Sequence, residues 1–478
     1  MKKRLFTIAI LTASVLSLSV SCSDDFVDRE FHQSVEQAPL KNLQEIQAFV
    51  KGAYASMRST NYYGADYLAF GEVRSDKMYS NLAGGYYQNI QNYTMLSTDA
   101  YATNTWNKIY EMIAKTNIVI NSDVAAFTGT DTDKSRSYYS QGQAYGLRAI
   151  GFFDLLRLYG QKYTGGNLGV VLPTKYDPKA KMARATIAET EAQIVADFDK
   201  ALALMSTNTP LAISGKTDLS IPALKALMSR FYLYKGDYAK VRQLTNELAA
   251  AGYAAPISAG LVKESFNYTL NGAASNSIFE LAVGQVASLG TTSYGYRLQY
   301  GGYANIQPKK DVVESLYANN DVRKTLFTEF PTKGNGNWFI SGKYTNGSGN
   351  DNIKMVRNEE VLLNGVEAEL NGGSPIKALD YYKTLLRLRL LPIKNADGSE
   401  KSVEDQLLTI NSVTMDDLKK ERSRELIGEG QRQWDLLRWG DKSFVPASVD
   451  KNLIAFPIPR AEINIVDTKI VQNPGYEK

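Results

Sequence analysis

Two carboxylates stand four residues apart in a densely charged stretch, residues 422–440. On a helix Glu425 and Glu429 would share one face, and paired carboxylates are the groups that glycosidases use for acid and base catalysis. Arginines flank both residues, and neighbouring positive charges keep carboxylates ionised and occupied. We therefore interpret the pair as part of a buried ion-pair network with Arg432 and Asp435, not as a catalytic pair.

The same stretch predicts a helix wedged inside the protein, because large apolar residues alternate with charges of both signs. Gly428 and Gly430 each cost such a helix about 0.8–1 kcal/mol relative to alanine. We expect another element to approach the backbone closely at these glycines and to offset that cost.

Catalytic and metal sites that need histidine or cysteine have few candidate residues in this chain. The chain has one histidine, His32, and one cysteine, Cys22, and both lie near the N-terminus. This excludes Ser-His and Cys-His nucleophiles and zinc sites built on these residues. Asp131 and Asp133 begin like a calcium loop, but Gly142 stands where the loop needs glutamate. We expect no cofactor, while a structural calcium ion and a glycosidase built on other carboxylates stay open.

Residues 1–21 have the pattern of a signal peptide. Three basic residues come first, and residues 5–20 are apolar but too short and too polar for a membrane span. Cys22 follows at once and cannot form an internal disulfide, so we interpret it as a lipidation site. A secretory signal with an incidental cysteine is the alternative. Residues 22–40 are polar and predict a flexible tether.

Composition gives no reason to expect a nucleic-acid partner, and it points to an aromatic binding surface. Lys and Arg number 54 against 50 Asp and Glu, and three of the basic residues belong to the signal peptide. A nearly neutral mature chain gives no reason to expect nucleic acid. Tyr outnumbers Phe by 30 to 17, and exposed amphipathic rings suit binding surfaces. Tyrosine and tryptophan can stack on the apolar C–H faces of sugar rings.

Apolar residues at helical spacing predict a mainly α protein. The predicted helices span residues 42–58, 106–126, 138–159, 187–205, 222–235, 238–251, 352–371 and 375–391, with a short one at 309–319. The helices at 222–235 and 238–251 are joined by a tight turn at Gly236. The helices at 352–371 and 375–391 are joined by a similar turn at Gly373. Such repeated helical hairpins are typical of tetratricopeptide-like α-solenoids.

Two regions of the predicted domain, residues 41–478, lack this period. Residues about 59–104 and 254–350 are rich in Gly, Asn and Tyr and predict long irregular loops, apart from a strand at 277–283. Long loops in compact domains are usually functional. Trp106 and Trp434 follow apolar stripes instead, so we expect them to pack in the scaffold.

Several motifs resemble the SusD/RagB family. They are Arg422 to Gly440 with its Glu-Leu, Glu-Gly-x-Arg and Arg-x-Gly elements, Ile458-Pro459 before Glu462-Ile463, Gln472 to Tyr476, Arg148-Ala149 to Tyr159-Gly160, and Arg357 to Ala368. The resemblance covers nearly the whole chain. It implies an outer-membrane lipoprotein, anchored through Cys22 and facing the cell exterior, with tetratricopeptide-like helix pairs. It also implies a SusC-like TonB-dependent transporter as partner and an oligosaccharide or, in some members, a peptide as ligand.

In that family loop aromatics hold the ligand, so we expect the site in the two irregular regions. The predicted stacking residues are Tyr62, Tyr63, Tyr86, Tyr87, Tyr294, Tyr296 and Trp338, and the predicted polar partners are Asp66 and Arg297. The favoured function is non-catalytic oligosaccharide binding. The alternatives are a peptide-binding member of the family and a lipid-anchored glycan-degrading enzyme.

Overall fold

The computed structural model describes residues 38–477 apart from 209–214, 269–271, 273 and 331–337. The predicted signal peptide, Cys22, His32 and nearly all of the tether lie outside the described residues. The chain divides into two compact units, Met1–Pro39 and Leu40–Lys478. The elements below belong to the second unit.

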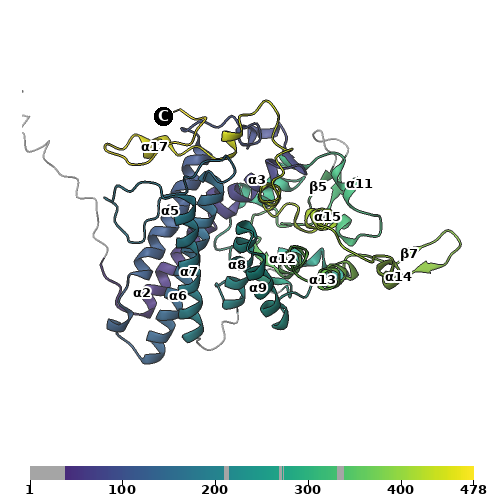
Figure 1. Cartoon of the computed structure of the whole chain (residues 1–478), viewed down its shortest axis with the longest axis horizontal. Coiled ribbons are helices and arrows are strands. Elements are labelled where there is room, and N and C mark those ends of the chain that lie inside the picture. Colours follow the sequence, from purple (N-terminus) through teal and green to yellow (C-terminus); the bar gives the residue numbers. More distant parts are fainter. Residues whose placement is uncertain (1–37, 209–214, 269–271, 273, 331–337, 478) are drawn as a thin grey trace, which may run out of the picture. The chain divides into compact units, whose positions relative to one another are not determined.

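Four long helices pack in sequence in the N-terminal half (Figure 1). They are α2 (Leu43–Met57), α5 (Ala100–Ile120), α6 (Asp131–Tyr159) and α7 (Ile187–Thr207). The predicted apolar stripes form their buried faces. Helix α6 begins earlier than predicted because Thr130 and Asp133 cap it reciprocally. The calcium-like Asp131-x-Asp133 pattern is therefore the first turn of a helix.

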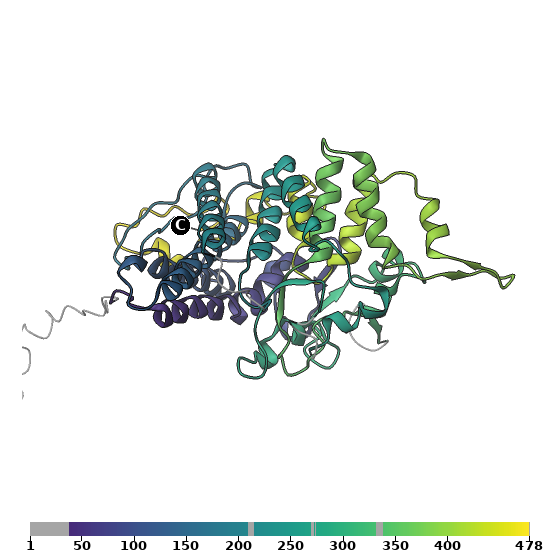
Figure 2. The ribbon, with the colours of Figure 1, turned by 90° about the horizontal axis from the view of Figure 1, so that it is seen from below.

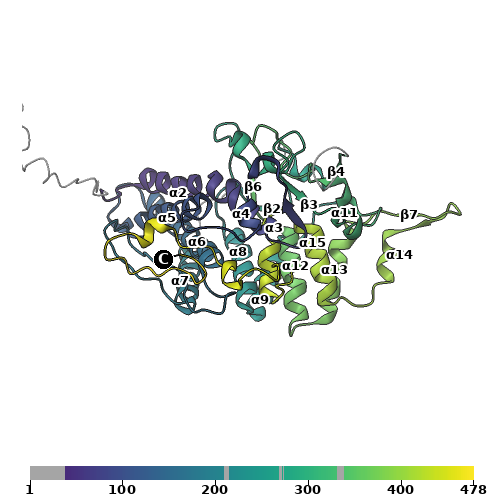
Figure 3. The ribbon, with the colours of Figure 1, turned by 90° about the horizontal axis from the view of Figure 1, so that it is seen from above.

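The predicted helical hairpins are confirmed. They are α8 (Ile221–Lys235) with α9 (Tyr238–Ala250), and α12 (Asn358–Leu370) with α13 (Pro375–Arg387). Helix α9 also packs against α12, so the two hairpins stack. Gly236, at φ 75°, ends α8 in the left-handed conformation that glycine adopts without strain. Figures 2 and 3 show the segment between α9 and α12, coloured teal to green, gathered on one side of these hairpins.

Four short antiparallel strand pairs are present in the described part of the chain. They are β1 (Met78–Ser80) with β3 (Ile306–Pro308), β2 (Ser277–Leu281) with β6 (Ile353–Arg357), β4 (Thr328–Glu329) with β5 (Trp338–Phe339), and β7 (Ile393–Lys394) with β8 (Glu400–Lys401). Strand β2 confirms the predicted strand. Strand β6 corrects the helix predicted from residue 352, because residues 353–357 pair with β2 before α12 begins.

The first predicted loop region holds more regular structure than expected. It contains α3 (Asp66–Val73), the one-turn helix α4 (Gln88–Gln91) and a π-helical turn at Thr60–Gly64. All eight residues of α3 are buried. A helix that is covered on every side has no polar face, so its sequence shows no helical period.

The remaining helices are short or lie near the C-terminus. They are α10 (Tyr294–Leu298), α11 (Val312–Leu316), α14 (Val403–Leu408), α15 (Met415–Leu426), α16 (Arg432–Arg438) and α17 (Arg460–Ile463). None of the helices in the described ranges combines the length and the apolar character that crossing a bilayer requires.

The charged stretch at residues 422–440 is two helices, not the single predicted one. Helices α15 and α16 are separated by a turn in which Gly428 and Gly430 have φ values of 77° and 74°. The expected close approach is confirmed, since Gly71 of α3 lies directly against Gly430. The Gly430 amide also donates to the Glu72 carboxylate at 2.7 Å.

This close approach predicts the effect of adding one methyl group at Gly71. The Cβ of Gly71→Ala would overlap the carbonyl oxygen of Gly430, so we expect the free energy of unfolding to fall by about 1–3 kcal/mol. Gly52→Ala is the matched control in α2, where the new Cβ would lie 3.6 Å from Lys115. There we expect a gain of about 0.5–1 kcal/mol. Urea unfolding of both variants checks the pair, and equal effects would contradict this packing.

The prediction that Glu425 and Glu429 belong to a buried ion-pair network is confirmed, and their partners come from distant segments. Glu425 pairs with Arg323, Arg357 and Arg389, and Arg357 also binds Glu429 at 2.7 Å. These neighbouring positive charges hold the pKa of Glu425 well below its usual value although burial opposes them.

The remaining two members of the predicted network have other partners. Asp435 pairs with Arg422 and Arg438. Arg432 departs from the prediction, because it binds Asp76, which is partly exposed, through two contacts of 2.6 and 2.8 Å.

Candidate functional site

Strands β1 and β3 bring the two irregular regions together. Ser80 at the end of β1 pairs with Ile306 at the start of β3. The residues just beyond these strand ends therefore meet, and Tyr86 of the first region lies against Tyr303 of the second, with ring centroids 5.2 Å apart.

Two of the solvent-facing tyrosine rings lie against the guanidinium of Arg297, and a third packs on one of them. The Cζ of Arg297 lies 3.6 Å from the centroid of the Tyr86 ring and 4.8 Å from that of Tyr303. Tyr296 meets Tyr303 edge to face at 4.9 Å, and its carbonyl accepts the Tyr303 amide at 2.8 Å. We call Tyr86, Tyr296, Arg297 and Tyr303 the aromatic platform.

The platform opens to solvent through its rings. Tyr303 is 40% exposed, and Tyr86 and Tyr296 are partly exposed, while Arg297 is buried behind them. A hydrogen bond from Arg297 is the main cause that lowers the pKa of the Tyr86 hydroxyl. Partly exposed tyrosines offer an apolar ring and a polar tip together, which is the combination a sugar needs.

Asp66 and Tyr87 are buried residues that lie next to Arg297 of the platform. The Tyr87 hydroxyl donates to Asp66 Oδ1 at 2.9 Å, and the Tyr87 ring stacks on Tyr101 at 5.0 Å. Burial raises the pKa of Asp66 to about 7, against the opposing effects of Tyr87 and Arg297. Asp66 is only 4% exposed, so it is a support of the platform and not the direct ligand partner that the sequence predicted.

Four predicted stacking residues are corrected by their burial. Tyr62, Tyr63, Tyr87 and Tyr294 are each 2% exposed or less, and a covered ring has no face for a ligand. The hydroxyls of Tyr62 and Tyr63 donate to the buried carboxylate of Asp154, which also pairs with Arg157. Tyr62 and Tyr63 therefore provide hydrogen bonds to the buried Asp154 carboxylate and do not face a ligand.

Trp338 remains a candidate in a different place. It is partly exposed on β5 and lines a hollow of about 430 Å³. The other lining residues are Lys310, Asp311, Glu314, Ser315 and Glu329. None of them belongs to the aromatic platform.

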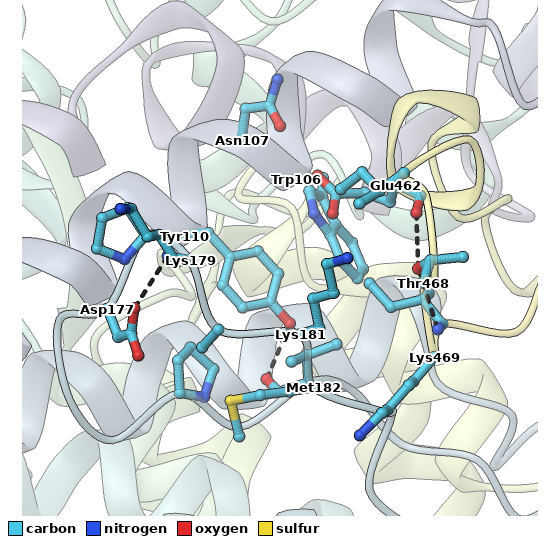
Figure 4. Close-up of a pocket in the computed structure, with 16 residues that line it drawn as sticks. Trp106, Asn107, Tyr110, Asp177, Lys179, Lys181, Met182, Glu462, Thr468 and Lys469 are labelled. Atoms are coloured by element: carbon cyan, nitrogen blue, oxygen red, sulfur yellow. Dashed lines mark hydrogen bonds between the residues drawn. The ribbon is translucent and has the colours of Figure 1, made fainter. Parts of the chain in front are cut away.

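A larger hollow, of about 630 Å³, lies against α5 between residues 171–182 and 462–470 (Figure 4). Trp106 and Tyr110 form part of its wall, and the Tyr110 hydroxyl donates to the Val171 carbonyl at 2.9 Å. Trp106 is only 3% exposed, consistent with its predicted packing role. No side chain that lines this hollow is among the buried polar groups without a partner, so nothing singles out a ligand there.

Metal and acid–base chemistry find little support in the described ranges. No group of three or more His, Cys, Asp or Glu side chains that could hold a metal ion occurs among the described residues. The network carboxylates are tied to arginines, and the two carboxyls of α3, Asp66 and Glu72, are buried.

Glu72 predicts a pH-dependent stability. Its pKa is raised to about 7, mainly by burial and against backbone hydrogen bonds from Gly430 and Gly428. The native state therefore keeps a proton that the unfolded chain, with a pKa near 4.5, has lost. The stability from this proton is complete below the unfolded pKa and is lost as pH rises through 7.

Glu72→Gln stays neutral, so between pH 5 and pH 8 it should gain about 2–3 kcal/mol of unfolding free energy relative to the parent protein. Chemical denaturation at both pH values measures this gain. Glu264→Gln, at an exposed position, controls for the loss of one negative charge. A gain that does not change with pH would contradict a buried, protonated Glu72.

Tyr303 is the platform residue that the sequence-based site prediction did not include. It lies in the same aromatic run as Tyr296 and is no different from its neighbours in sequence context. Only its contacts with Tyr86 and Arg297 identify it.

Two protein-family models match this chain. A family model described as "Starch-binding associating with outer membrane" matches residues 25–233, and a model of the SusD family matches residues 328–451. SusD-like protein P2 of Formosa agariphila is 24% identical, and the match covers 100% of both chains.

Solved structures share the fold. A SusD superfamily protein from Bacteroides thetaiotaomicron matches with a TM-score of 0.76 at 24% identity, over 91% of this chain and 100% of that one. Surface glycan-binding protein A from the same species, solved in complex with laminarihexaose, matches with a TM-score of 0.69 at 18% identity, over 90% and 99% of the two chains.

Proposed function

This chain belongs to the SusD/RagB family, and we propose that it binds oligosaccharides at the cell surface without hydrolysing them and delivers them to a SusC-like TonB-dependent transporter. The aromatic platform is the observation that carries the proposal. It joins partly exposed tyrosines from both irregular regions around one arginine. The glycan-binding relative solved with laminarihexaose supports the same ligand class.

The charged side chains support binding over catalysis. A glycosidase needs two carboxyl groups that reach the substrate. The two carboxyls of α3, Asp66 and Glu72, have raised pKa values but are only 4% and 0% exposed. Glu425 and Glu429 are held by arginines in the core. The proposal requires no metal or cofactor.

The test is a binding and turnover experiment on the purified lipoprotein in detergent. Titration calorimetry against a panel of glycans and of mixed peptides should give binding to glycans. Analysis of the glycans afterwards should find no new reducing ends. New reducing ends would overturn the non-catalytic role, and binding of peptides alone would favour the peptide-binding alternative.

The membrane anchor has its own test, because Cys22 follows the predicted signal peptide directly. Replacing it in Cys22→Ala removes the thiol that would carry the lipid, so most of the protein should leave the membrane fraction. Cell fractionation with immunoblotting measures this. Retention of the variant in membranes at normal expression would refute lipidation at Cys22.

A further inference from the structure

Ten arginines are buried in the described part of the chain, and Arg297 differs from the other nine. Each of those nine donates hydrogen bonds to a carboxylate or to backbone carbonyls. They are Arg74, Arg148, Arg157, Arg184, Arg230, Arg323, Arg357, Arg389 and Arg422. In the interior of this protein a guanidinium is therefore normally paired with oxygen.

Arg297 meets neither kind of partner among the described residues. Its Nε and Nη1 are buried and have no hydrogen-bond partner in the described part of the chain. The Tyr86 hydroxyl acts on its charge, and its close contacts are the ring faces of Tyr86 and Tyr303. Arg297 is 5% exposed, so solvent does not replace the missing acceptors.

The charges around Arg297 leave this cation incompletely balanced. The acidic group that acts on it is Asp66, on α3, whose Oδ1 accepts from Tyr87 and whose pKa burial raises to about 7. The groups that face Arg297 from the other neighbouring elements are the tyrosines Tyr86, Tyr87 and Tyr101. A buried charge that lacks a partner is strongly destabilising, so two unused donors on a buried cation need an explanation.

A forked guanidinium matches an anionic oxygen pair, as in a carboxylate or a sulfate, better than a single hydroxyl. We propose that Arg297 makes this site selective for glycans that carry negative charge, either uronic acid carboxylates or sulfate esters. This inference rests on the proposed function, because it assigns the ligand class of the same platform.

A ligand can reach Nε and Nη1 of Arg297 only if the Tyr86 ring, which lies over the guanidinium, shifts. Tyr86 follows Gly84 and Gly85, which have φ values of 72° and 68°. No heavy atom of another part of the chain lies within 4 Å of the position that a Cβ on Gly85 would take. The turn before Tyr86 therefore has free space on one side, which allows the ring to move from Arg297 when an anionic group enters.

The experiment uses pairs of glycans that share a backbone and differ in charge. The pairs are polygalacturonate with its methyl ester, and dextran sulfate with dextran, within a wider panel of neutral oligosaccharides. Calorimetry on the purified lipoprotein should show at least one charged glycan binding tenfold or more tightly than its neutral partner. Raising the salt concentration should weaken that binding, because salt screens charge attraction. The pair that responds distinguishes carboxylate from sulfate.

Variants of Arg297 distinguish recognition of the ligand's negative charge from a role in holding the tyrosine rings in place. Arg297→Gln should bring the charged-to-neutral affinity ratio to within about twofold, because the charged glycan should lose much more affinity than its neutral partner. Arg297→Lys keeps the charge but loses the fork, so it should retain part of the ratio. A residue that only held the tyrosine rings would weaken charged and neutral glycans by the same factor, and that result would overturn the proposal.

The failures of the two proposals are distinguishable. Binding of neutral glycans alone, or equal binding within every pair, overturns charge selectivity and leaves oligosaccharide binding standing. Binding of no glycan in the panel contradicts both. If Arg297→Gln unfolds, the salt dependence and the paired affinities of the unaltered protein still decide the matter.

Discussion

Replacing Arg357 by methionine is expected to lower the free energy of unfolding by about 3–5 kcal/mol. Arg357 is 2% exposed and binds Glu359 at 2.8 Å, Glu425 at 3.1 Å and Glu429 at 2.7 Å. Methionine fills part of the space but leaves buried carboxylates short of a partner. Chemical denaturation monitored by circular dichroism measures the loss.

The matched control for Arg357 is Arg432→Met. Arg432 also makes two contacts to one carboxylate, but its partner Asp76 is 29% exposed in its side chain. Water can solvate the carboxylate that is left behind, so the expected loss is only about 1 kcal/mol. Equal losses in the two variants would contradict the view that desolvation makes the Arg357 network critical.

Removing both outer rings of the aromatic platform should give the largest loss of ligand affinity. In the double variant Tyr86→Ala and Tyr303→Ala, two stacking rings disappear from one surface. Each ring is expected to contribute about 1–2 kcal/mol, by analogy with bases that stack on aromatic side chains. The dissociation constant for the bound glycan should therefore rise at least about tenfold, with the thermal midpoint nearly unchanged.

Two single variants show whether that loss is specific. Tyr176→Ala removes a ring that is 43% exposed, similar to Tyr303, but lies in another segment, so it should leave the affinity unchanged. Trp338→Ala tests the hollow at β5. A loss of binding in Trp338→Ala, with normal binding in the double variant, would move the site from the platform to that hollow.

Local sequence predicted much of the scaffold because the signal of an amphipathic helix is local. Helices α2, α7 and α9 each have one buried and one exposed face, so the apolar period appears in the sequence itself. The turn at Gly236 could be predicted for the same reason. Helix α3 could not, because burial on all sides removes the contrast between faces.

The tyrosines show where local information ends. Tyr62 and Tyr86 both stand in irregular, tyrosine-rich sequence, yet Tyr62 is fully buried and Tyr86 is partly exposed. Asp154, far along the chain on α6, decides the first case by accepting the Tyr62 hydroxyl. The pairing of β1 with β3 decides the second, because it brings Tyr303 and Arg297 to Tyr86.

Residue types and their local spacing were enough to predict the mainly helical hairpin scaffold, the aromatic and charged residues available, and the glycines that permit a close backbone approach. Those properties depend on residue type and on spacing within a few turns. Tertiary contacts were needed to show which tyrosines form a surface, that Arg432 pairs with Asp76, and that Nε and Nη1 of Arg297 have no hydrogen-bond partner among the described residues. These outcomes depend on groups that chain folding brings together from distant positions, and no local pattern encodes which partner arrives.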